Sequence, residues 1–162
     1  MRWITGKELE RFVQQQVKFY QPSAIGNVGL DVHLGSKLYI EKEIHSTQRL
    51  HVLEYATWRE LYDTKVIPMH GHTLKAKHFL LAETLEYFQM PAHVSGTMTL
   101  RSWAAKSGLE QSSSLDLKPG WEGNLILELF NSLTHHELQL LPGSAIAQIK
   151  FFDIRGNEDD GK

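Results

Sequence analysis

A single acidic residue inside an apolar stretch is the first candidate for chemistry in this sequence. Glu128 is the only charge in residues 125–130, LILELF, which follow the turn residues Pro119, Gly120 and Gly123. The run has strand length and apolar residues at both alternating positions, so we expect a strand covered on both faces. A carboxylate buried there has its pKa raised by desolvation or is held ionised by a cation. Enzymes use such a group to move protons near neutral pH; the alternative is a structural glutamate paired with an arginine.

A second group of polar residues follows the strand predicted at residues 94–100. Arg101 and Ser102 begin a predicted helical turn that closes at Gly108. Backbone N–H groups at a helix start attract anions, and an arginine adds a bidentate phosphate clamp. Lys106 stands four residues after Ser102 and therefore projects from the same face. The alternative is that Arg101 is a surface residue and Ser102 only caps the turn.

Histidine-based metal binding has to be weighed, because the chain has 9 histidines and no cysteine. His70 and His72 flank a glycine in a predicted turn without a third ligand nearby, which favours an exposed turn over a metal site. His135 and His136 are adjacent, so their side chains point apart in a hairpin. Without cysteine, disulfides, Cys-ligated zinc and thiol nucleophiles are excluded. We predict no metal held by protein ligands, and no zinc.

The overall composition is that of an ordinary globular protein. The 162 residues predict one domain, residues 1–154, followed by a flexible, acid-rich tail at 155–162. The formal net charge of −2 gives no basic surface for nucleic acid. There is no run of about 18 apolar residues, and the N-terminal residues do not resemble a signal peptide. We therefore expect no nucleic-acid or membrane partner, and a cytoplasmic location.

Short extended segments between turn residues must position the candidate residues. A capping box at residues 5–8 predicts a helix that fades among residues 14–16. A turn at Gly35-Ser36 predicts two strands, at residues 28–34 and 37–40. Further strands are predicted at residues 78–88, 94–100, 115–117, 125–130, 137–141 and 145–154, whereas residues 57–65 could be a helical turn or a surface loop. The pattern predicts an all-β sandwich or barrel with a short N-terminal helix.

Four segments, in this order, resemble the dCTP deaminase branch of the trimeric dUTPase superfamily over residues 3–154. GLDVHLGSK (29–37) is similar to the family's D-x-R-L-G segment, and residues 78–103 are similar to the strand pair that enters its R-S-S motif. KPGWEGNLILELFN (118–131) resembles I-D-P-G-[WF]-x-G-x-x-x-L-E-x-x-N, and LPGSAIAQIKFF (141–152) resembles the closing P-G-x-x-I-x-Q-x-x-F strand. The resemblance implies a distorted jelly-roll or β-barrel of the dUTPase-like type.

The resemblance also implies a role for each matching residue. Glu128 falls on the glutamate that shuttles protons while water attacks C4 of cytosine, without zinc. Ser102 falls on a serine beside that glutamate, Lys106 on the last residue of the same catalytic motif, and Arg101 on the arginine that reaches the triphosphate. The remaining implied substrate-binding residues are Trp103, Ser112, Ser113, Ser114, Leu115, Asp116, Lys118 and Gln148. The family is homotrimeric with sites between subunits, and Mg²⁺ accompanies its deoxycytidine nucleotide substrate.

The sequence departs from the family pattern mainly where phosphates are bound. Lys106 replaces an arginine, which keeps the charge but loses the bidentate fork. Trp103 replaces the second serine, and Lys118 replaces the aspartate of I-D-P-G, for which Asp116 on the same strand face could substitute. The family's C-terminal arm has no counterpart after Arg155. The leading hypothesis is hydrolysis of dCTP to dUTP and ammonia; the alternatives are a non-catalytic nucleotide-binding or regulatory relative and a dUTPase, which normally needs the replaced aspartate.

Overall fold

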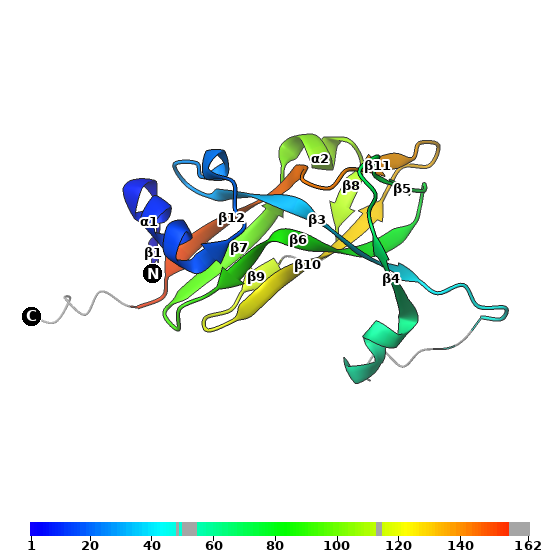
Figure 1. The fold of residues 1–162 in the computed structure, drawn as a ribbon, viewed down its shortest axis with the longest axis horizontal. Helices are drawn as coiled ribbons and strands as arrows, with labels where there is room; N and C mark the ends of the chain where they lie inside the picture. The colour runs from blue at the N-terminus through cyan, green and yellow to red at the C-terminus, as the bar shows by residue number, and fades with distance from the viewer. Residues whose placement is uncertain (48, 50–54, 113–114, 156–162) are drawn as a thin grey trace, which may run out of the picture.

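The fold is built almost entirely from antiparallel strands (Figure 1). The computed structural model describes residues 1–47, 49, 55–112 and 115–155. In chain order the elements are β1 (Arg2–Trp3), α1 (Gly6–Gln16), β2 (Val17–Lys18), η1 (Pro22–Ala24), β3 (Leu30–Glu41), η2 (Tyr55–Leu61), β4 (Tyr62–Val66), β5 (His72–Leu74), β6 (Phe79–Gln89), β7 (Val94–Leu100), α2 (Ser102–Lys106), β8 (Leu109–Gln111), β9 (Leu115–Leu117), β10 (Glu122–Asn131), β11 (Leu138–Leu140) and β12 (Ala145–Asp153). The predicted all-β architecture with a short N-terminal helix is confirmed.

One curled sheet contains most of the strands. Its order is β8-β10-β6-β3-β12-β7-β9, with β1 on β12, β2 on β6 and β4 on β3, while β11 and β5 form a separate pair. The strand β3 joins the two halves of this sheet, because its first part pairs with β12 and its second part with β6 and β4. The apolar faces of both halves meet in one core, in which Leu34, Leu127 and Phe151 are fully buried.

The predicted turn at Gly35-Ser36 is wrong, because β3 runs through both residues as one strand of 12 residues. The glycine serves a close backbone approach instead. A Cβ at Gly35 would lie 2.7 Å from the carbonyl oxygen of Glu83 and 3.0 Å from that of Thr84 on β6. The β3–β6 register also shifts between Leu34 and Leu38. Glycine in a strand often marks such an irregularity, and here it lets β3 change partners.

The N-terminal helix α1 lies at one end of the sheet (Figure 1) and ends at Gln16, as predicted. It buries Leu9, Phe12 and Val13, which share one face, and the Phe12 ring lies 4.8 Å from that of Phe151 on β12. The predicted capping box is wrong: Thr5 is the N-cap residue, but its side chain makes no capping hydrogen bond.

Most predicted strands are confirmed to within one or two residues, and β7 matches its prediction at both ends. Five short strands were not predicted, namely β1, β2, β4, β5 and β8, and β5 begins at His72, where a turn was expected. Of these, β4 and β8 border the part of the sheet that carries Glu128. The undecided residues 57–65 contribute the end of η2 and most of β4, which forms by pairing with β3. The short β8 forms by pairing with β10. Both are peripheral strands that depend on a partner far away in the sequence. Within the described residues, no helix is long and apolar enough to cross a membrane.

Candidate active site

Glu128 lies on the outer face of β10, opposite to the core. The burial along this strand alternates strictly: Leu125, Leu127 and Leu129 are buried, whereas Ile126, Glu128 and Phe130 are half-buried. The expectation that both faces are covered is therefore wrong for the single chain. That expectation came from the apolar residues at both alternating positions, but only one face of β10 meets the core.

A cavity of about 630 Å³ opens on this outer face, and Glu128 is part of its lining. The floor comes from β6 and β10, where Leu81 stands directly opposite Glu128 in the antiparallel register. The two rims come from segments far apart in the chain: one from β9 and the turn before β10, and the other from η2 and β4. The side chains that line these rims include Asp116, Lys118, Trp121, Trp58 and Tyr62.

The backbone around Glu128 is fixed by hydrogen bonds from β8. The Glu128 N–H donates to the side-chain Oε1 of Gln111 at 3.1 Å, and the Ser112 N–H donates to the Glu128 carbonyl at 3.0 Å. Among the described residues, no side chain donates a hydrogen bond to the Glu128 carboxylate or forms an ion pair with it. The same carboxylate helps to raise the pKa of Tyr62, after the larger effect of burial and the effect of Glu41. Glu128 is thus anchored by its backbone and presents its carboxylate to the cavity.

Arg101 does not lie in this cavity; it pairs with Asp31 on β3. Its Nη1 donates a 2.6 Å hydrogen bond to Asp31 Oδ1, which also accepts one from Gln148 Nε2 at 3.0 Å. Two predicted substrate-binding residues are therefore joined by a carboxylate that the sequence did not single out. Both partners of the ion pair remain partly exposed, so the guanidinium can reach an incoming anion.

The other predicted residues divide between these two regions. Asp116 and Lys118 share the cavity with Glu128, and Ser112 contacts the Glu128 backbone. In contrast, Ser102, Trp103 and Lys106 lie in the exposed part of α2 and are not part of the cavity lining. Ser113 and Ser114 lie outside the described residues, as does the side chain of Leu115. Within one chain, Glu128, the predicted proton shuttle, therefore lies apart from Arg101 and Lys106, the predicted phosphate-binding residues.

A match to a protein-family model identifies the family of this chain. The model of dCTP deaminase-like proteins matches residues 3–154, nearly the whole described chain. The chain belongs to the dCTP deaminase-like family. A dCTP deaminase of Buchnera aphidicola subsp. Baizongia pistaciae is 30% identical over 159 residues, which cover 91% of this chain and 82% of the relative. A dUMP-forming dCTP deaminase of Aquifex aeolicus is 30% identical over 151 residues, covering 90% and 76%.

Solved structures confirm the fold of this dCTP deaminase-like chain. The 2'-deoxycytidine 5'-triphosphate deaminase of Agrobacterium tumefaciens superposes with a TM-score of 0.73 at 17% identity, over 93% of this chain and 47% of the other. A dUTPase of Staphylococcus bacteriophage 80alpha gives a TM-score of 0.52 at 15% identity, over 88% and 92%. The predicted dUTPase-like fold type is thereby confirmed.

A buried contact between a histidine and a glutamate of this dCTP deaminase-like chain was not predicted. His33 on β3 and Glu86 on β6 are both buried; His33 Nδ1 lies 2.6 Å from Glu86 Oε1, and the His33 N–H donates to Oε2 at 2.9 Å. Burial raises the pKa of Glu86, although the contacts with His33 oppose the shift. Glu86 shares the buried face of β6 with Leu80, Ala82 and Phe88, so it is a charged residue at a position where the alternation of the strand predicts an apolar one. That signal could have drawn attention to it, but its partner is 53 positions away.

The described part of the chain offers no protein cage for a metal. No group of three or more His, Asp or Glu side chains in it could hold an ion. Of the histidines considered for a metal, His72 belongs to β5, where burial and the charge of Lys65 lower its pKa.

Proposed function

We propose that this protein hydrolyses dCTP to dUTP and ammonia without zinc, with Glu128 as the proton shuttle. The observation that carries the proposal is the position of Glu128: its carboxylate lines a cavity of about 630 Å³ on the outer face of β10. That volume falls in the range of small-molecule sites. The family membership and the dCTP deaminases among the relatives support the same reaction.

The proposed mechanism uses the Glu128 carboxylate first as a base and then as an acid. It takes a proton from a water molecule while the water oxygen bonds to C4 of the cytosine ring. The electron pair of the C4=N3 bond moves to N3, which receives this proton from Glu128. The hydroxyl proton of the tetrahedral centre then passes through Glu128 to the 4-amino group, the C4–N4 bond breaks, and ammonia leaves. C4 becomes a carbonyl carbon, so water and dCTP are converted to dUTP and ammonia. General acid–base catalysis of this kind contributes about 10²–10⁴-fold to a rate.

We propose that the working enzyme is a homotrimer with sites shared between subunits. Among the described residues, the cavity lining contains one cation, Lys118, whereas a triphosphate carries several negative charges. Arg101 and Lys106 would supply further positive charge, but neither lines the cavity of its own chain. A neighbouring subunit that brings its Arg101, Ser102 and Lys106 to Glu128 would complete the site. Lys106 and Lys118 then act as point charges, and Arg101 as the bidentate clamp.

Magnesium would accompany the nucleotide rather than belong to the protein. Mg²⁺ keeps several water ligands and is commonly bound through phosphates with one or two carboxylates. Asp116 is the exposed carboxylate on the cavity rim that suits this role. We propose that the enzyme acts on the free deoxynucleotide pool of the cytoplasm.

The products distinguish the proposed reaction from the related ones. The protein is incubated with dCTP, dCMP and dUTP, and ammonia and pyrophosphate are measured separately. Ammonia from dCTP without pyrophosphate is the expected result. Ammonia together with pyrophosphate would identify a dUMP-forming enzyme, as the Aquifex aeolicus relative is named. Pyrophosphate from dUTP alone would identify a dUTPase, and binding of dCTP without either product would identify a non-catalytic relative.

A further inference from the structure

We propose that Trp58, on the rim of the Glu128 cavity, stacks against the pyrimidine ring and is a substrate-positioning residue. This inference rests on the proposed function, because it assigns a binding role at the same cavity. No sequence motif identifies Trp58, which lies in the segment whose structure the sequence left undecided. We call residues 58–66, from the end of η2 through β4, the aromatic arm; Figure 1 shows η2 projecting beyond the sheet next to the start of β4.

The aromatic arm brings two rings to the cavity. Trp58 and Tyr62 both belong to its lining, together with Glu128 and Leu81 from the floor. The two rings meet edge to face, with centroids 6.2 Å apart at an interplanar angle of 65°. The charge of Glu128 contributes to the raised pKa of Tyr62, which places this part of the arm within electrostatic reach of the carboxylate. A ring bound near Glu128 would therefore have an aromatic neighbour.

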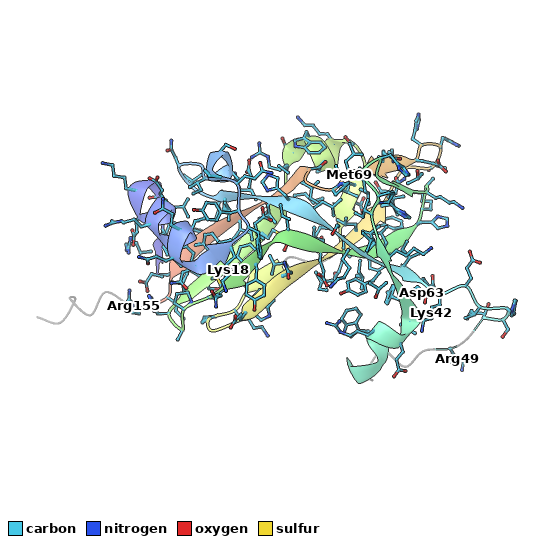
Figure 2. All side chains as sticks on the ribbon, viewed as in Figure 1. Lys18, Lys42, Arg49, Asp63, Met69 and Arg155 are labelled. Carbon is cyan, nitrogen blue, oxygen red and sulfur yellow. The ribbon has the colours of Figure 1, made fainter. Side chains whose placement is uncertain are left out.

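The base of the aromatic arm is fixed to the sheet. The β4 strand pairs with β3 over its whole length, and the Lys42 N–H donates to the Leu61 carbonyl at 2.9 Å. Figure 2 shows Lys42 and Asp63 close together at this junction. Trp58 therefore lies only a few residues before β4, whose backbone is hydrogen-bonded to β3.

The Trp58 ring itself is held by its neighbours. The ring of Tyr39, which is buried, contacts it edge to face at a centroid distance of 6.1 Å and an angle of 73°. The Tyr39 hydroxyl in turn donates to Glu83, which also pairs with Lys37 at 3.1 Å. The Arg59 guanidinium also lies over this ring, 4.7 Å from its centroid. These contacts fix the orientation of the indole before any ligand binds, which lowers the entropic cost of binding.

A pyrimidine bound in this cavity would need an aromatic side chain against its flat face. A pyrimidine has two flat faces, and its recognition commonly combines an aromatic platform with polar groups at the ring edge. Glu128 acts on the ring edge at C4 in the proposed reaction and cannot hold the faces. Trp58 has the larger of the two aromatic side chains on the η2–β4 rim, whereas the implied substrate-binding residues Asp116 and Lys118 lie on the other rim. Trp121 of the motif also lies on that other rim, so Trp58 supplies an aromatic contact from the side of the cavity that the motif segments do not line.

The test measures dCTP binding in a Glu128→Gln background, so that the nucleotide is not consumed. Trp58→Ala should weaken dCTP binding about 5- to 150-fold, the loss expected for removing one base–aromatic stack. Trp58→Phe keeps a ring against Tyr39 and should retain most of the affinity, yet it should reduce the tryptophan quenching by dCTP, with the remainder coming from Trp121 in the same cavity. Trp3→Ala is the matched control, because Trp3 packs on Phe152 at the other end of the sheet. It should change neither the affinity nor the quenching.

The outcomes separate this inference from the proposed function. If Trp58→Ala binds dCTP as tightly as its parent, or if Trp58→Phe leaves the quenching unchanged, the stacking role is overturned. If dCTP binding depends on Trp58 but the unmutated protein releases no ammonia, the stacking role stands and the proposed reaction fails. If the unmutated protein releases ammonia with unchanged KM and kcat in Trp58→Ala, the proposed reaction stands and the stacking role fails.

Discussion

Arg101 Nη1 and Asp31 Oδ1 are joined by a 2.6 Å hydrogen bond between β3 and the start of α2. This contact affects the interpretation of two acidic residues, Glu128 and Asp31. A purely structural Glu128 would be paired with an arginine, but within the chain Arg101 is paired with Asp31 instead. Asp31 also holds Gln148, so one carboxylate orients two residues that resemble the family's substrate-binding positions.

Arg101→Ala should lower kcat/KM for dCTP about 10- to 100-fold, near the 1.5–3 kcal/mol of a hydrogen bond to a charged group. Arg101→Lys should recover only part of this, because lysine lacks the bidentate fork. The melting temperature should change little, since the Arg101–Asp31 pair is partly exposed. Steady-state kinetics and thermal unfolding measure both quantities. Arg2→Ala is the matched control: it breaks the Arg2–Glu8 surface pair of 2.6 Å at the opposite end of the fold. An equal loss of activity in both variants would contradict the phosphate-binding role.

Glu128→Gln should reduce deamination of dCTP by about 10²–10⁴-fold, because the amide cannot carry the proton. Its stability should be nearly unchanged, since the side chain is half-buried and has no ionic partner among the described residues. Ammonia release and the melting temperature of the same preparation report both effects. Glu110→Gln, on the adjacent strand β8 and exposed, should retain full activity. Full activity in Glu128→Gln would exclude the proton-shuttle role.

The protein should be a trimer in solution. The cavity with Glu128 and the cations Arg101 and Lys106 occupy different parts of one chain, so a complete site needs a neighbour. Light scattering at micromolar concentration should give three times the chain mass. Mixing the impaired variants Glu128→Gln and Arg101→Ala should give more activity than either variant alone, because mixed trimers contain some sites with both native residues. A monomer with full activity would refute the shared site.

Chelation with EDTA should weaken dCTP binding without unfolding the protein. The described residues form no metal cage, so any Mg²⁺ should arrive with the phosphates. Calorimetric titration with dCTP, with and without Mg²⁺, measures the first effect, and circular dichroism measures the second. Deoxycytidine, which has no phosphates, serves as the control ligand whose binding should not respond to EDTA. Stoichiometric zinc in the purified protein would contradict this prediction.

The His33–Glu86 pair should make stability depend on pH. Burial raises the pKa of Glu86 above the value of 4.5 expected in the unfolded chain. Between these two pKa values the folded state holds a proton that the unfolded state has released. Binding of this proton to Glu86 stabilises the folded state relative to the unfolded state. This contribution is complete below about pH 4.5 and is lost as the pH rises through the folded-state pKa of Glu86.

Urea unfolding at several pH values should show this loss in the wild type and a flatter profile in Glu86→Gln, which cannot titrate. Parallel profiles would contradict the assignment. His33→Ala removes the only side chain among the described residues that hydrogen-bonds the Glu86 carboxyl group and should cost about 1–3 kcal/mol, the usual penalty for leaving a buried polar group without its partner.

The sequence by itself determined the local elements and the identity of the family. The alternation of Val94, Gly96 and Met98 fixed β7 to the residue, because a half-buried strand repeats with period two whatever its partner is. Gly108 ended the helical turn as predicted and has a φ of +84°, a conformation that glycine adopts without a steric penalty. Such signals depend on neighbours within a few residues, and they are therefore readable from one chain.

Tertiary structure alone decided which faces are covered and which distant residues meet. Gly35 looked like a turn because its real role, a 2.7 Å approach to the Glu83 carbonyl, belongs to a strand 48 positions later. The apolar run around Glu128 could not show that only one face meets the core. Nor could it show that Trp58 borders the same cavity. Pairings such as His33 with Glu86, or Arg101 with Asp31, depend on strand register across the sheet, which the packing of the whole chain sets.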